Sequence, residues 1–215
     1  MRLPRSISGL LLLLSSLATS TPYTGPLTCL PSGTLMPTPS YPLTQTSNPI
    51  FTVCSTLSIS PPQTQNCTHI LTALQDFPRY PSWNSFARID ALSPPPLTVG
   101  SPILITSFGL FPAGLPSSTV ELISFWSESW VARGRQDEGK MVYLTAWKLE
   151  LPGVMKAEHA STVVDEGDGA CRYMSWETYF GPGSVLVREG LGEGLEDGFE
   201  SQGLELKAWV EGGNV

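Results

Sequence analysis

The segment Asp76-Phe77-Pro78-Arg79-Tyr80-Pro81-Ser82-Trp83-Asn84-Ser85-Phe86 decides how the rest of the sequence is interpreted. Just before it, Ile70, Leu71 and Leu74 recur on one helical face, which predicts a helix from Cys67 to Phe77. The two internal prolines then mark turns. We expect the three aromatic residues after the first proline to form a cluster that seals the base of a larger core.

Seven other stretches have the composition of strands, and glycine and proline turns separate them. Short connections between the later ones favour an antiparallel meander. The predicted strands are Ile50–Ser60, Phe86–Leu92, Ile103–Phe111, Val120–Val131, Met141–Leu149, Met155–Val164 and Arg172–Phe180.

A last helix is predicted from Gly183 to Val210, with its apolar residues on one stripe. Five glycines interrupt the same stretch, and each interior glycine costs about 1 kcal/mol relative to alanine. Packing against a sheet must therefore hold this helix. We expect the small residues on its inner face to leave empty volume beneath it. The apolar stripe consists of Leu191, Leu195, Phe199, Leu206 and Val210.

The order of these elements and the residues of the opening segment resemble the START-like superfamily, also called SRPBCC. The family pattern is an aspartate, a phenylalanine, a tyrosine three residues on, and then Trp-Asn-x-Phe. The chain carries it as Asp76, Phe77, Tyr80 and Trp83-Asn84-Ser85-Phe86. Further similar residues lie in Leu151–His159, in Glu177–Gly181, at Trp147 and in the helix end Leu206-Lys207-Ala208.

The resemblance covers residues 50–211 and implies a helix-grip fold of the α+β class. A seven-stranded curved antiparallel sheet would wrap around the long C-terminal helix, with short helices after the first strand. The family includes polyketide cyclase/dehydrase-like ligand-binding domains, so an internal apolar cavity is implied as well.

The remaining residues suggest a secreted chain. Residues 1–20 combine Arg2 and Arg5 with an apolar run and small residues, the pattern of a cleaved signal peptide. The run is roughly a dozen residues, whereas a spanning helix needs about 20. Residues 21–49 are rich in Pro, Ser and Thr and predict a flexible segment. Secretion would make Asn66, in Asn66-Cys67-Thr68, a glycosylation acceptor.

An oxidising compartment would also let the four cysteines form disulfides. In the family fold the first and last strands are neighbours, which permits Cys54 with Cys171. Cys54 with Cys67 is the local alternative, Cys29 lies in the flexible segment, and buried free thiols are the third alternative.

Composition excludes several classes of function. The net charge is −7, and 17 of the 19 acidic residues lie after residue 120, which argues against nucleic acid and anionic membranes. Only two histidines are present, which argues against a multi-histidine metal centre. No phosphate loop or nucleophile elbow occurs, so no metal and no cofactor is predicted.

His159 and Glu177 form the sharpest candidate pair for chemistry. Equal counting from a turn at Glu166–Gly169 places His159 opposite Glu177 or Trp176, and directly opposed side chains share a face of the sheet. A carboxylate beside an imidazole can hold the ring oriented and charged. An ordinary surface pair is the structural alternative.

Two functions are compatible with these features. The first is a secreted protein that binds a hydrophobic small molecule, lipid or polyketide-like, with no nucleic-acid partner and no stable membrane insertion. The alternative is a cyclase/aromatase-type enzyme that uses His159, Glu177 or Tyr143 to move protons; a third possibility is a structural protein with a filled cavity. The predicted ligand-binding residues are Trp126, Tyr143, Trp147, His159, Glu177, Leu191, Leu195 and Phe199.

Overall fold

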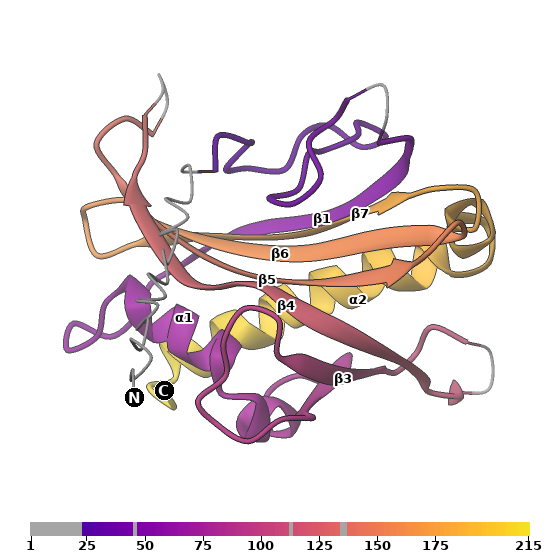
Figure 1. Ribbon diagram of the computed structural model, residues 1–215. Helices are drawn as coiled ribbons and strands as arrows, with labels where there is room; N and C mark the ends of the chain where they lie inside the picture. Colours follow the sequence, from indigo (N-terminus) through magenta and orange to yellow (C-terminus); the bar gives the residue numbers. More distant parts are fainter. Residues whose placement is uncertain (1–22, 45–46, 112–113, 134–136) are drawn as a thin grey trace, which may run out of the picture.

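The structure is a computed structural model that describes residues 23–44, 47–111, 114–133 and 137–215; the predicted signal peptide lies outside these residues. One curved sheet, one long helix and two short helices make up the fold (Figure 1). Along the chain they are β1 (Pro49–Ile59), α1 (Cys67–Gln75), η1 (Phe77–Ser82), β2 (Ala87–Ala91), β3 (Pro102–Ser107), β4 (Ser117–Val131), β5 (Met141–Leu151), β6 (Met155–Asp165), β7 (Cys171–Phe180) and α2 (Ser184–Glu211).

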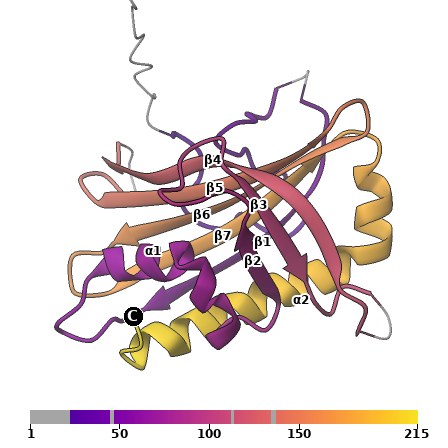
Figure 2. The ribbon, with the colours of Figure 1, turned by 60° about the horizontal axis from the view of Figure 1, so that its bottom comes forward.

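The sheet has the strand order β1-β7-β6-β5-β4-β3-β2, and all its neighbours pair antiparallel. Strands β2 to β7 form the predicted meander, and β1 joins it beside β7. The sheet curves around α2, and α1 lies beside the C-terminal part of that helix (Figure 2). The predicted helix-grip fold is therefore confirmed.

Hydrogen bonds explain the local shape of the opening segment. The side chain of Asn84 accepts from the backbone N–H groups of Phe86 (3.0 Å) and Ala87 (2.8 Å), which turns the chain from η1 into β2. The hydroxyl of Tyr80 donates to the carbonyl of Leu74 at 2.9 Å and ties η1 to α1. The rings of Tyr80 and Trp83 lie 4.7 Å apart. The aromatic cluster thus forms at the junction of the short helices and the sheet.

The glycines of α2 do not all have the predicted effect. A Cβ at Gly198 would lie 2.2 Å from the ring of Phe86, and one at Gly203 would lie 2.7 Å from Leu57. These two glycines therefore let neighbouring side chains pack against the helix backbone, and they leave no empty volume. Gly190, in contrast, has no neighbour within 4 Å of such an atom.

The Pro-rich segment is held against the sheet instead of hanging free. It lies on the face opposite α2 (Figure 1), where Met36 is buried. The backbone N–H of Met36 donates to Thr52 at 3.0 Å, and Thr178 donates to the carbonyl of Met36 at 2.7 Å. The indole of Trp176 donates to the carbonyl of Pro37 at 3.1 Å. Its described part therefore differs from the flexible segment that we expected, because it covers an apolar sheet face.

Both predicted disulfide pairings are wrong, as is the free-thiol alternative. Cys29 pairs with Cys54, and Cys67 pairs with Cys171. Cys54 lies on the sheet face that points away from α2, which we call the outer layer, and there it meets Cys29 of the Pro-rich segment. The sequence had not predicted that this segment packs on the sheet. Cys171 lies on the other face, the inner layer, which points toward α1 and α2. It is the first residue of β7 and bonds to Cys67 at the start of α1. Among the described residues, no helix is long and apolar enough to cross a membrane.

Candidate functional site

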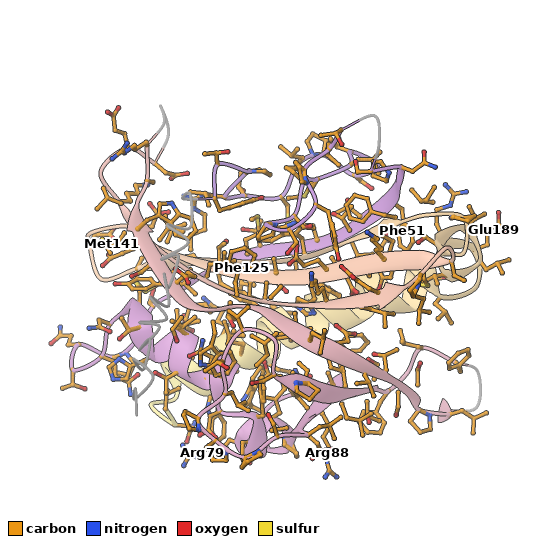
Figure 3. All side chains as sticks on the ribbon, viewed as in Figure 1. Phe51, Arg79, Arg88, Phe125, Met141 and Glu189 are labelled. Atoms are coloured by element: carbon orange, nitrogen blue, oxygen red, sulfur yellow. A yellow bond between two sulfur atoms is a disulfide. The ribbon has the colours of Figure 1, made fainter. Side chains whose placement is uncertain are left out.

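A cavity of about 240 Å³ lies between the concave face of the sheet and α2. Alternate residues of β2 to β7 form its walls, and the first half of α2 closes it. Most of the lining is apolar. Figure 3 shows the side chains on both faces of the sheet. The apolar lining includes Ile89, Ile105, Leu149, Val187, Leu195 and Phe199.

Six of the eight predicted ligand-binding residues line this cavity: Trp147, His159, Glu177, Leu191, Leu195 and Phe199. The other two lie elsewhere. Trp126 packs against Phe77, with ring centres 5.6 Å apart, and borders a separate surface pocket. Tyr143 opposes Val163 nearer the α1 end of the sheet, in the packed core.

The aromatic cluster reaches the cavity as well. Tyr80 and Phe86, which we expected to seal the base away from any ligand, are among its lining residues, whereas Trp83 is not. Tyr80 therefore has two roles, because its hydroxyl binds α1 while its ring forms part of the cavity wall.

The predicted register between β6 and β7 is confirmed, since His159 opposes Glu177 directly. Both side chains point inward, because the same row continues through Trp147 on β5 and Val53 on β1. The tight turn between β6 and β7 fixes this register, and a slip of one residue would turn both side chains to the other face.

His159 is buried and uncharged. Its Nε2 lies 2.8 Å from the hydroxyl of Ser175, and its ring packs between Trp147 (4.8 Å) and Phe199 (4.7 Å). Burial lowers the pKa of His159 to about 3. The imidazole is therefore neutral at physiological pH, and Glu177 does not hold it charged as the sequence suggested.

Two glutamates define the polar part of the cavity. Burial raises the pKa of Glu121 to about 7. Burial, and then the charge of Glu121, raise the pKa of Glu177 to about 8. Both side chains are more than nine-tenths buried. Both groups line the same cavity, Glu121 from β4 and Glu177 from β7.

Glu121 was missed in the sequence, although a signal was present. The stretch from Val120 to Val131 is largely apolar, and the acid occupies the position two before Ile123, on the same face of the strand. An acidic residue on a buried face is informative because such groups are almost never fully buried without a partner.

Two polar atoms in the cavity wall have no hydrogen-bond partner among the described residues. They are Oε2 of Glu121 and Nε1 of Trp147. The other oxygen of Glu121 accepts from Thr119 at 2.9 Å. Buried polar groups are nearly always satisfied in native proteins, so each of these atoms calls for an explanation. No cluster of three potential metal ligands occurs within the described residues.

Comparison with known proteins identifies the fold. No protein-family model matches the sequence, and no curated protein matches it either. The chain is similar to the solved structure of a hypothetical protein from Helicobacter pylori, with 13% identity over 74% of this chain and 87% of the other and a TM-score of 0.55. It is also similar to a protein from Thermus thermophilus, with 10% identity over 76% and 99% of the two chains and a TM-score of 0.50.

A START superfamily protein from Mycobacterium smegmatis matches with 15% identity over 75% of this chain and 97% of the other, at a TM-score of 0.47. At such identities, structural likeness concerns the fold alone. The strand order and the long closing helix give the chain the helix-grip fold that the sequence predicted.

Proposed function

We propose that this protein binds a small hydrophobic molecule in the cavity between the sheet and α2. The observation that carries this proposal is the cavity itself, which is about 240 Å³ in volume, mainly apolar in its lining and interrupted by a few polar atoms. Ligand sites commonly combine apolar walls with a few placed polar groups. Removing apolar surface from water supplies about 25 cal/mol per Å².

The cavity volume limits the size of the guest. Sites for drug-sized ligands span about 300–1,000 Å³, and this cavity lies below that range. A compact guest with one or two rings fits such a space better than a lipid with long acyl chains. We therefore favour a compact ring molecule within the broader class of lipids and polyketide-like compounds.

We further propose that the protein is secreted. Two disulfides are typical of an oxidising compartment, and residues 1–20 have the pattern of a signal peptide. Asn66 is exposed at the start of α1, where its oxygen accepts from the backbone N–H of Thr68 at 3.0 Å. Its side-chain nitrogen is the expected glycan acceptor. Intact-mass measurement of secreted protein, before and after glycosidase treatment, tests cleavage and glycosylation together.

Binding is tested by blocking the cavity from one face of β4. Ser117 lines the cavity, whereas the next residue, Ser118, is exposed on the other face and contacts Thr106 at 3.0 Å. We expect Ser117→Phe to lower the affinity for a fluorescent apolar probe at least tenfold and Ser118→Phe to leave it unchanged. Native mass spectrometry of the full chain should detect a co-purifying guest only when Ser117 is intact. Equal probe binding by both variants would contradict the proposal.

One observation keeps the cyclase/aromatase alternative as a second candidate, namely that His159 and Glu177 both face the cavity. The protonation states favour binding, because an imidazole with a pKa of about 3 is a weak general base at neutral pH. Tyr143 lies outside the cavity, which removes the third candidate acid. A polyketone probe recovered with its mass unchanged supports binding, and a product lighter by one water supports the enzyme.

A further inference from the structure

The polar part of the cavity contains acidic groups without a cation. Glu121 and Glu177 face the space from β4 and β7, and none of the described residues that line it is a lysine or arginine. Two arginines, Arg79 in η1 and Arg88 in β2, are close in sequence to residues that line the cavity. Both lie at the surface (Figure 3), with more than half of each side chain exposed. The protein itself therefore supplies no counter-charge at this position.

The hydrogen bonds of the two glutamates are incomplete: Glu177 is hydrogen-bonded by Tyr179, whereas only one oxygen of Glu121 accepts, from Thr119. Oε2 of Glu121 has no partner among the described residues, although the side chain is 7% exposed. Within the same cavity, the indole N–H of Trp147, which is 1% exposed, is an independent unpartnered donor. A buried polar group without a hydrogen-bond partner destabilises the folded protein, and more strongly when it is charged. A guest with a donor for Glu121 and an acceptor for Trp147 would remove both costs.

We propose that the guest, taken as the occupant of the cavity in the proposed function, is a small organic amine that binds as an ammonium ion between Glu121 and Glu177. Its apolar body fills the part of the cavity against Leu149 and Leu195. A hydroxyl, ether or carbonyl oxygen on that body accepts from Nε1 of Trp147.

A cation fits this site better than a neutral guest for two physical reasons. Two buried carboxylates repel each other, and a positive charge between them adds two attractions that offset this repulsion. Aromatic rings also attract cations at their faces, most strongly when water is excluded. The cavity wall supplies such rings from four elements: Trp147, Tyr179, Tyr80 and Phe199.

Proton release accompanies the binding of such a guest. In the empty cavity the raised pKa values of Glu121 and Glu177 keep them largely protonated near pH 6. An ammonium ion favours their ionised forms, so binding must expel a proton at that pH. The other titratable groups facing them are His159 from β6, Tyr179 from β7 and Tyr80 from η1. Burial keeps the pKa of His159 low and those of both tyrosines high, so all three stay neutral between pH 6 and 8.

Affinity for an amine should therefore rise with pH, whereas affinity for a neutral guest should not. The test uses cyclohexylmethylamine and its neutral counterpart cyclohexylmethanol, measured by isothermal titration calorimetry on the full chain with both disulfides intact. We expect the amine to bind at least tenfold tighter than the alcohol at pH 8. We also expect its affinity to fall about tenfold or more between pH 8 and 6, since release of one proton corresponds to at most tenfold per pH unit.

Matched variants separate this inference from the proposed function. Glu121→Gln and Glu177→Gln should each remove most of the preference for the amine while the alcohol still binds. Glu193→Gln, an exposed change on α2, should alter neither affinity. Titration in two buffers with different ionisation enthalpies should show proton release for the amine alone.

Each outcome decides a different point. Equal or weaker binding of the amine overturns the inference and leaves the proposed function standing, because the alcohol still occupies the cavity. A retained preference in both Glu→Gln variants also overturns it, since the charge would then be recognised elsewhere. Failure of both probes to bind overturns the inference and counts against the proposed function as well.

Discussion

The outer and inner faces of the sheet bury glutamates in two different ways. On the outer face, Glu158 is fully buried beneath the Pro-rich segment and accepts three hydrogen bonds, two from Ser40 and one from Ser124. The next residue of β6, His159, lies on the inner face and opposes Glu177 on β7. Glu121 lines the same cavity as Glu177, and one of its oxygens has no hydrogen-bond partner among the described residues. Two successive residues of β6 thus face opposite layers: one layer in which the buried glutamate is fully hydrogen-bonded, and one in which a buried glutamate oxygen has no partner.

The difference separates a structural site from a binding site. The carboxylate of Glu158 has its hydrogen bonds supplied by the chain, so it stabilises the contact between the Pro-rich segment and the sheet. Burial raises the pKa values of the inner carboxyls, and no cation lines their cavity to offset it. The proposed guest would supply the partner that Oε2 of Glu121 lacks among the described residues.

The two disulfides give the largest test of this comparison, because each fastens one layer. Cys67–Cys171 spans 104 residues in the inner layer, and Cys29–Cys54 spans 25 in the outer layer. The chain-entropy relation predicts losses of about 4.7 and about 3.5 kcal/mol in the free energy of unfolding for the double Cys→Ala variants. Urea titration measures both. A larger loss for Cys29–Cys54 would show that loop length does not decide the contribution of these disulfides.

A single substitution made on each face should have opposite effects. Glu158→Gln puts an amide where donors already point, so it should destabilise the protein by about 2 kcal/mol. Glu177→Gln removes a buried group without a counter-charge and should be neutral or stabilising at pH 8. Chemical unfolding at pH 8 compares the two variants. Destabilisation of equal size would show that Glu177 is as well satisfied as Glu158.

The pH dependence of stability sharpens the same comparison. The folded pKa values of Glu121 and Glu177 are about 7 and about 8, above the ordinary value of 4.5. The folded state therefore binds more protons than the unfolded state between about pH 4.5 and 8. Stability then falls as pH rises through this window, by up to about 1.4 kcal/mol per pH unit for each group.

The double variant Glu121→Gln/Glu177→Gln should lose this slope, whereas Glu193→Gln should retain it. Thermal unfolding of both variants at pH 5, 6, 7 and 8 supplies the measurement. A wild-type protein that gains stability toward pH 8 relative to the double variant would show that the inner carboxylates are stabilised as anions.

A last pair of variants tests how closely α2 packs against the rest of the inner layer. Gly198→Ala places a methyl group within 2.2 Å of the ring of Phe86 and should destabilise the protein by about 1–3 kcal/mol. Gly190→Ala meets no neighbour within 4 Å and should stabilise α2 by about 1 kcal/mol. Thermal unfolding compares the two. Tolerance of alanine at Gly198 would mean that the helix does not pack closely there.

Local pattern accounts for what the sequence predicted correctly. The strands β1 to β7 follow from alternation and turn residues, and α2 follows from a stripe of apolar residues. Counting from the turn at Glu166–Gly169 narrowed the residue opposite His159 to Glu177 or Trp176, and the structure has Glu177 there. Each of these features depends on residues that are near each other in the chain.

The misses share a different cause, because they depend on contacts between distant residues. Two register shifts in β4, between Ile123 and Glu128, accompany the curvature of the sheet. In a flat sheet, Glu121 and Glu177 would be three strand spacings and two residues out of register, about 16 Å apart. Nothing in the residues around Glu121 specifies that curvature, so the acidic pair was not predicted.

By itself, the sequence determined the order of the elements, the pairing of β6 with β7 and the closing helix, since periodicity and turn chemistry act over a few residues. Only the tertiary structure decided which sheet face Cys54 and Glu158 meet, how the four cysteines pair and that two glutamates share a cavity. Those outcomes depend on contacts between segments that are far apart in the chain. A local sequence pattern does not specify which segment will pack against a given sheet face.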